Sequence, residues 1–156
     1  MKTKSWVGNE FTEFAPDSFA TQEPGIPAVI QGSAFNQTRQ SYLATHLSVA
    51  DSHWSRLRGL MGTPAGKFSA GFGLWIVPSH GVHTFAMRFP IDVIYLDEDR
   101  LVVHLEHSLQ PWRIAPVRWR AASVLELPAA TLRPTGTSLG DKIEISLRPV
   151  VQAVTA

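Results

Sequence analysis

The most informative absence in this chain of 156 residues is cysteine, which does not occur at all. Without thiols there is no disulfide bridge, no thiolate metal site and no cysteine nucleophile, and nothing in the composition indicates an oxidising compartment. Every catalytic or metal-binding hypothesis therefore rests on histidine, carboxylate, arginine or hydroxyl side chains.

An excess of charge of either sign is also missing. The 14 Lys and Arg residues nearly balance the 13 Asp and Glu residues, which gives a formal net charge of +1. A chain with so little net charge has no global field that would attract nucleic acid or an anionic membrane. The balance disfavours a nucleic-acid partner, and a small polar ligand or a protein partner must be recognised by a local site.

Long hydrophobic runs are absent as well. No window approaches the roughly 18 apolar residues that a membrane-spanning helix needs. Lys2 and Lys4 are followed by Trp6, Val7 and polar residues rather than by the apolar stretch of a secretory signal. These features predict a soluble, cytoplasmic protein with no membrane partner. No pattern in the sequence indicates an oligomeric state.

The length fits one domain preceded by an extension. Residues 1–40 are rich in Pro, Gly and small polar residues, and their aromatic residues have no regular spacing. We interpret them as an N-terminal extension that is flexible or draped over the fold. Residues 41–150 are predicted to form a single β-rich domain, followed by a C-terminal tail at residues 151–156.

Alternation of apolar and polar residues predicts that most of this domain is β-strand. One helix is predicted over 52–62, capped by Asp51 or Ser52, and a short helical turn before Pro134. Residues 85–89 are expected to be extended, and the predicted strands cover 42–49, 74–77, 91–96, 101–108, 123–128 and 142–147. Because strands do not alternate with long helices, we predict a mainly β (α+β) fold: a compact, mostly antiparallel, barrel-like or curved sheet with one packed α-helix.

The stretch 73–97 carries most of the functional candidates. His80 and His83 lie in the turn that follows one predicted strand, and Arg88 and Asp92 follow them. Asp92 belongs to a strand with apolar residues on both faces, so we expect its carboxylate to be at least partly buried. A buried carboxylate needs a cationic or hydrogen-bonding partner.

A metal site is one hypothesis for these side chains. His80 and His83 could reach the same ion, with Asp92, His104 or His107 completing the coordination. Two histidines across a turn are a weak signal, because a metal site usually needs three or four ligands. We therefore predict no metal and no cofactor.

Acid–base catalysis of the hydrolase type is a second hypothesis. His83 would act as base or acid, Asp92 would orient it, and Glu126 would be a second carboxylate with a raised pKa. His83 could equally fix the turn through a hydrogen bond. No nucleophile with a partnered base is visible in the sequence.

The charged candidates also have structural roles open to them. Asp92 and Arg88 could form a buried ion pair that holds the strand ends, and Glu126 could pair with Arg58 or Arg118. Ion-pair networks of this kind perturb pKa values without any function, so clustered charges alone do not establish a site.

A binding module is the third hypothesis. Trp75, Trp112 or Trp119, exposed beside arginine side chains, could hold a sugar or a protein partner through stacking and hydrogen bonds. The same interleaving of Arg and Trp occurs in proteins that bind single-stranded nucleic acid, but the near-neutral charge disfavours that partner. The structural alternative is that Trp112 and Trp119 lie in the core and the arginines in solvent.

Four segments together resemble a known family: "RLRGLMG" at 56–62, "HTFAMRFPIDVIYLD" at 83–97, "ASVLELPAA" at 122–130 and "LGDKIEI" at 139–145. In this order they are similar to the domain of unknown function 192 family, a prokaryotic group without an established activity. The resemblance covers about residues 42–147 and implies a compact, predominantly β single domain. The positions that match the family's motif residues are Arg58, Gly59, Leu60, Met61, His83, Met87, Arg88, Asp92, Glu126, Gly140 and Asp141.

These observations lead to one predicted site. We predict that a small polar ligand or partner binds to a set of five side chains: Arg58, His83, Arg88, Asp92 and Glu126. The alternative is a hydrolase-type enzyme that uses His83, Asp92 and Glu126 as acid and base groups.

Overall fold

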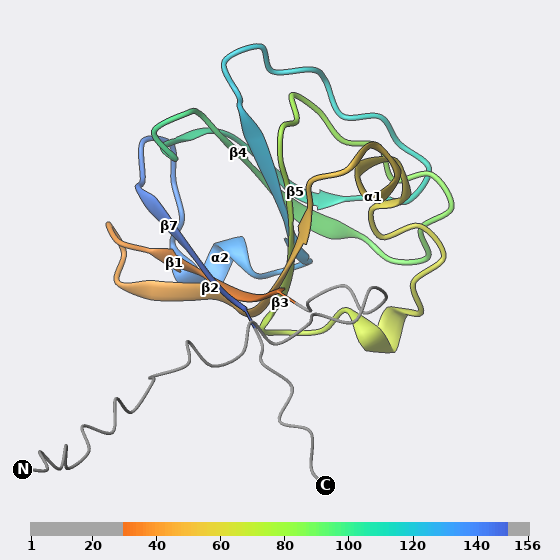
Figure 1. Cartoon of the computed structure of the whole chain (residues 1–156), viewed down its shortest axis with the longest axis horizontal. Helices are drawn as coiled ribbons and strands as arrows, with labels where there is room; N and C mark the ends of the chain where they lie inside the picture. Colours follow the sequence, from red (N-terminus) through yellow and green to blue (C-terminus); the bar gives the residue numbers. More distant parts are fainter. Residues whose placement is uncertain (1–29, 150–156) are drawn as a thin grey trace, which may run out of the picture.

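Seven strands and two short α-helices make up residues 30–149, the part of the chain that the computed structural model describes (Figure 1). No helix within this range is long and apolar enough to cross a membrane. In chain order the elements are β1 (Ile30–Asn36), β2 (Ser41–Ala50), α1 (His53–Arg58), the 3₁₀ turn η1 (Ala65–Lys67), β3 (Phe72–Ile76), β4 (Ile91–Leu96), β5 (Val102–Leu109), β6 (Ser123–Pro128), α2 (Leu132–Thr135) and β7 (Ile143–Pro149).

The strands form one mixed sheet in the order β5-β4-β6-β3-β2-β1-β7. Every neighbouring pair is antiparallel except β2 and β3, which are parallel. The sheet curves strongly but is not closed (Figure 1): among the described residues, an isolated bridge between Leu101 and Lys142 joins the segments that precede the two edge strands. The prediction of a mainly β fold with a mostly antiparallel curved sheet is confirmed, and "barrel-like" describes the sheet only loosely.

Two hydrophobic layers enclose the centre of the sheet. All six residues of β4 and of β6 are buried, and their side chains alternate between two clusters, because successive side chains of a strand point to opposite faces. Ile94 and Leu125 belong to the inner cluster, which also takes residues from β1, β2, β7 and α2. Val93 and Val124 belong to the outer cluster, which takes the rest of its residues mainly from loops. The prediction that strand 91–96 is covered on both sides is confirmed.

The outer cluster is covered by two segments that run side by side, residues 78–90 and 110–121, which we call the flap. Backbone hydrogen bonds join them: the N–H of Ala115 donates to the carbonyl of Val82 at 3.0 Å, and the N–H of Arg118 donates to that of His80 at 2.7 Å. Val82 and Ala115 are buried on the inner side of the flap. The flap and α1 therefore form an outer layer over β3, β4 and β6.

The first strand corrects the predicted domain boundary. β1 lies within the stretch interpreted as an extension, yet it pairs with β2 on one side and β7 on the other, so the domain begins before residue 40. The hydrophobic pattern of a strand is weak over residues 32–36, because the buried residues there are Gly32, Ala34 and Asn36. Asn36 donates to the carboxylate of Asp141 at 3.0 Å. Residues 1–29 and the predicted tail at 151–156 lie outside the described range.

Two further local predictions need correction. The first helix ends at Arg58 rather than at residue 62, because Gly59 adopts a φ of 42° and turns the chain; Ser52 caps its start through a capping box with Ser55. The segment 85–89 is a turn rather than a strand, since Ala86 has a φ of 57°. The flap therefore contains irregular backbone where alternation suggested extended structure.

Candidate functional site

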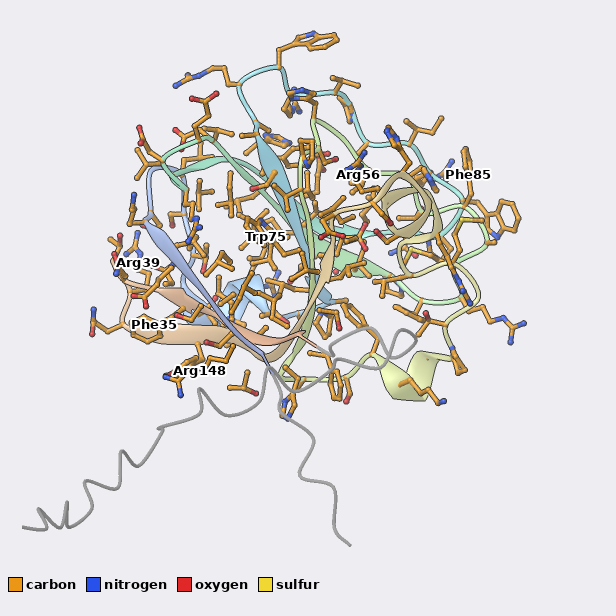
Figure 2. The ribbon with its side chains drawn as sticks, viewed as in Figure 1. Phe35, Arg39, Arg56, Trp75, Phe85 and Arg148 are labelled. Carbon is orange, nitrogen blue, oxygen red and sulfur yellow. The ribbon has the colours of Figure 1, made fainter. Side chains whose placement is uncertain are left out.

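A pocket of about 270 Å³ lies between the end of α1, the end of β3 and the flap. It brings together three of the five predicted site residues, Arg58, His83 and Glu126, while Arg88 and Asp92 are not part of its lining. The lining consists of Arg56, residues 58–61, Ile76, residues 78–79, residues 81–83 and Glu126. Figure 2 shows Arg56 on the side of the molecule that carries α1, the same side as Phe85 of the flap.

Glu126 enters the pocket from the middle of the sheet. It pairs with Leu74 of β3 and Val93 of β4, so its side chain shares the outer face with Val93 and is 3% exposed. Its Oε2 atom is buried and has no hydrogen-bond partner among the described residues. Burial raises the pKa of Glu126 to about 8, because the charged form loses its hydration. The carboxyl group is therefore mostly protonated at neutral pH.

His83 enters the pocket from the flap. Its backbone forms an isolated bridge with Ile114, and its ring stacks on Phe85 with the centroids 5.2 Å apart and the planes at 23°. The Nδ1 atom is buried and finds no hydrogen-bond partner in the described structure. The described contacts therefore do not show the structural alternative, in which a side-chain hydrogen bond from His83 fixes the turn.

The two arginines of α1 have different surroundings. The guanidinium of Arg56 donates to the carbonyl of Asp51 at 2.6 Å and lies 3.2 Å from Nδ1 of His53, which fixes it to the start of its own helix. Arg58 is exposed, and no hydrogen bond or ion pair joins its side chain to another described residue. The pairing of Glu126 with Arg58 or Arg118 is not found in this part of the chain.

Asp92 lies on the other face of the sheet. It pairs with Leu127, one position away from the pair formed by Val93 and Glu126, and its side chain therefore points to the inner layer. Its two carboxylate oxygens accept hydrogen bonds of 2.9 Å from the N–H groups of Ser108 and Leu132. The expectation of a buried carboxylate with a hydrogen-bonding partner is confirmed, but Asp92 cannot orient His83, which lies beyond the sheet.

The partners of Asp92 explain why the fold needs this carboxylate. Leu132 is the first residue of α2, whose N-cap residue Thr131 makes no side-chain cap, so Asp92 supplies the missing acceptor. Ser108 has a φ of 50° and lies next to a register shift between β4 and β5, where its N–H has no ladder partner to use. Arg88 is exposed and forms no ion pair with Asp92, which corrects that predicted pairing.

No group of three or more His, Asp or Glu side chains within residues 30–149 is arranged to hold a metal ion. His80 uses Nδ1 in a 2.5 Å hydrogen bond with the carbonyl of Ala121. His104 lies on β5, where its Nε2 atom is 2.7 Å from the carboxylate of Glu106. The histidines considered as joint ligands are therefore separated into different local networks.

A second polar cluster was not predicted from the sequence. Tyr95 packs its ring edge on His104, 5.4 Å between centroids, and Arg118 lies 3.0 Å from Nε2 of the same histidine. The Tyr95 hydroxyl is buried without a partner among the described residues, and burial, reinforced by the nearby charge of Glu106, raises its pKa to about 12. Tyr95 and His104 are directly opposite each other in the β4–β5 pairing, so a correct prediction of that register would have indicated the cluster.

The tryptophans considered for binding divide into two kinds. Trp75 is half-buried, with the guanidinium of Arg100 5.4 Å above its ring. Trp112 and Trp119, both in the flap, are 66% and 82% exposed. The alternative that Trp112 and Trp119 belong to the core is wrong.

Comparisons with known proteins agree on a family. The sequence profile of the domain of unknown function 192 family, described as "Uncharacterized ACR", matches residues 34–145. A UPF0127 protein from Thermococcus sibiricus is 32% identical over 114 residues, which cover 70% of this chain and 71% of that protein.

Two solved structures share the fold. A protein of unknown function from Novosphingobium aromaticivorans superposes with a TM-score of 0.63 at 20% identity, covering 78% of this chain and 94% of that one. A protein from Sinorhizobium meliloti 1021, described as a candidate transcription regulator, has a TM-score of 0.62 at 22% identity, covering 77% of this chain and 97% of that one. At these identities the likeness concerns the fold alone. The match across most of the β-rich domain, together with the relative from Thermococcus, shows that this chain belongs to the domain of unknown function 192 family.

Proposed function

We propose that the pocket beside α1 binds a small organic anion through Arg58, His83 and Glu126. The observation that carries this proposal is that two residues of its lining, Glu126 and His83, each carry a polar atom, Oε2 and Nδ1, that is buried without a partner among the described residues. Buried polar atoms in folded proteins nearly always have a hydrogen-bond partner. Two unpaired atoms on residues that line the same pocket therefore favour a polar molecule as the missing partner.

The charges around the pocket favour an anion. Arg56 and Arg58 line it, and Glu126 is the one acidic residue among the described lining. Because the pKa of Glu126 is about 8, this carboxyl group is mostly neutral at pH 7 and does not repel an anion. A neutral carboxyl group can instead donate a hydrogen bond to a carboxylate or phosphate oxygen.

The three residues have separate parts in this binding mode. Glu126 donates from the floor of the pocket, His83 supplies a ring nitrogen from the flap, and Arg58 pairs with the negative charge at the end of α1. The volume of about 270 Å³ is near the lower limit of small-molecule sites, so a compact head group fits better than a large ligand. Asp92 and Arg88 have no part in this mode, because neither lines the pocket.

A hydrolase-type enzyme is the second candidate, and the raised pKa of Glu126 favours it. A carboxyl group with a pKa near neutrality is suited to act as a general acid. In this mode Glu126 and His83 act without Asp92. Ser79 is the hydroxyl residue of the described lining, and its Oγ donates to the carbonyl of Gly81 at 2.8 Å, so we expect water rather than Ser79 to be the nucleophile. Turnover of a bound ester that is lost in Glu126→Gln would establish this function.

Titration by NMR and calorimetry with propionate, acetate and inorganic phosphate tests the binding proposal. We expect at least one of these anions to bind the wild type at neutral pH, and Arg58→Ala or Glu126→Leu to weaken it about tenfold, the usual value of a charge-assisted hydrogen bond. Glu126→Gln should retain binding, because its amide N–H can still donate to the anion. Arg88→Ala is the matched control, because it removes an exposed arginine outside the pocket. The proposal fails if no anion binds at millimolar concentration, or if Arg88→Ala weakens binding as much as Arg58→Ala.

A further inference from the structure

An exposed aromatic row leads away from the pocket along the flap. The ring of His83 stacks on Phe85, and the ring of Phe85 lies 6.3 Å from that of Trp112, centroid to centroid, at an angle of 48°. Phe85 is 39% exposed, Trp112 is 66% exposed and Ile114, which pairs with His83, is 69% exposed. Figure 2 shows Phe85 at the outer rim on the side of α1. The row therefore begins inside the pocket and ends in solvent.

The backbone holds Trp112 in an unusual conformation. Its φ of 62° lies in the left-handed region that bulky side chains rarely adopt. The buried residue Thr84 fixes it there: the N–H of Trp112 donates to the Thr84 carbonyl at 2.9 Å, and the N–H of Arg113 donates to Thr84 Oγ1, also at 2.9 Å. Strained backbone of this kind collects at functional sites. Here its effect is to hold a large apolar ring outside the core.

The charge around this row favours a negative ligand. Neither segment of the flap, 78–90 or 110–121, contains an Asp or a Glu, while Arg113, the residue after Trp112, is exposed. The other exposed tryptophan of the flap, Trp119, is different, because it borders a hollow lined by the acidic turn at residues 97–99. Phe85 and Trp112 differ from Trp119 in this respect: neither lines the hollow beside the acidic turn, and the flap segments that carry them contain no acidic residue.

We infer that the row formed by Phe85, Trp112 and Ile114 is an outer subsite of the pocket, and that the ligand is a carboxylate attached to an aromatic or other flat apolar body. This inference rests on the proposed function of the pocket. The head group binds to Arg58 and Glu126, and the apolar body lies against the exposed rings, where stacking and burial strengthen binding. Ile114 offers no hydrogen bond, which favours an apolar body over a sugar ring.

Four defined compounds test the inference by calorimetry at neutral pH: propionate, 3-phenylpropionate, 3-phenylpropionamide and glucuronate. We expect the phenyl ring to strengthen binding of the carboxylate about tenfold over propionate. Trp112→Asn should remove this advantage and leave the affinity for propionate unchanged, because Asn tolerates the left-handed backbone and lacks the ring. Trp119→Ala is the control and should retain the advantage. A thermal unfolding curve confirms that each variant is folded.

Each other outcome overturns the inference in a distinguishable way. If propionate and 3-phenylpropionate bind equally, or if Trp112→Asn keeps the difference, the row is not a subsite although the pocket function stands. If glucuronate binds more tightly than 3-phenylpropionate, the body is a saccharide rather than an apolar group. If the amide binds as tightly as the carboxylate, or no carboxylate binds, the pocket function fails and the inference fails with it.

Discussion

We expect the unfolding free energy of the wild type to decrease as the pH rises, because Glu126 is buried. In Glu126→Gln this decrease should be absent. Burial raises the pKa of this carboxyl group from 4.5 to about 8. A group whose pKa is higher in the folded state than in the unfolded state holds its proton more tightly when folded. Its stabilising contribution is therefore complete below about pH 4.5, decreases as the pH rises above that value, and is lost once the pH exceeds about 8.

The size of the effect follows from the same two pKa values. One pKa unit corresponds to about 1.4 kcal/mol, so the wild type should lose on the order of 3–4 kcal/mol of unfolding free energy between about pH 5 and pH 8. For a domain of this size that is roughly a 10 °C decrease in Tm. Glutamine has nearly the shape of the protonated carboxyl group but does not ionise. Glu126→Gln should therefore match the wild type at acid pH and exceed it above pH 8.

Urea and thermal unfolding of both proteins across this range measure the difference directly. Glu98→Gln serves as the control. Glu98 is exposed in the turn after β4, so its replacement should hardly change how the unfolding free energy depends on pH. Parallel stability curves for the wild type and Glu126→Gln would refute the reasoning, since they would mean that Glu126 ionises as easily in the folded state as in the unfolded state. The unpaired Oε2 atom would then need a different explanation from a neutral carboxyl group.

Three further predictions concern the framework around the site. Asp92→Ala leaves two backbone N–H groups without an acceptor and should destabilise the fold by roughly 2–5 kcal/mol in urea unfolding, with anion binding in the pocket unchanged because Asp92 lies on the other face. Gly73→Ala would place a Cβ atom 2.9 Å from that of Ala44 and should cost about 1–3 kcal/mol in the same assay, whereas Gly66→Ala, with no atom within 4 Å, should cost little. Burial raises the pKa of Asp141, but hydrogen bonds from an amide side chain, a backbone N–H and a guanidinium outweigh that effect and lower it, so stability should be lost as the pH falls towards and below 3.8. In thermal unfolding, the Tm of Asp141→Asn should decrease less than that of the wild type as the pH falls through this range.

Alternation in the sequence was enough to predict most strands and the burial of Asp92. It was not enough to find β1, because the buried positions of that strand among the residues whose burial is described are Gly32, Ala34 and Asn36, which carry little or no hydrophobic signal. The small residues have a packing reason: a Cβ atom on Gly32 would lie 2.7 Å from the side chain of Leu147. A strand selected for close approach to its neighbours therefore lacks the pattern by which strands are recognised.

The predicted site joined residues that the sheet separates, and the reason is the register. Alternation within one strand correctly predicted that Asp92 is buried, but only the pairing of β4 with β6 shows that Glu126 lies opposite Val93 and not opposite Asp92. A shift of one residue in that pairing would place both carboxylates on one face. Sequence alone does not determine such a register, so the expected cluster of Asp92 and Glu126 was reasonable but wrong.

The contrast between these two buried carboxylates is the strongest reason to place the site on the outer face. Each carboxylate oxygen of Asp92 accepts a hydrogen bond from a backbone N–H group, so its burial serves the fold. Glu126 is equally buried, its Oε2 atom has no partner among the described residues, and it lines a pocket together with His83, whose Nδ1 atom is also unpaired. A residue that only stabilised the fold would gain nothing from this arrangement, because an apolar side chain of similar volume would avoid the cost of burying a carboxyl group. Glu126→Leu should therefore raise the stability at alkaline pH while abolishing anion binding, whereas Asp92→Leu should lower stability at every pH. If Glu126→Leu instead unfolds the domain, the carboxyl group has a structural partner and the pocket loses its claim to be a site.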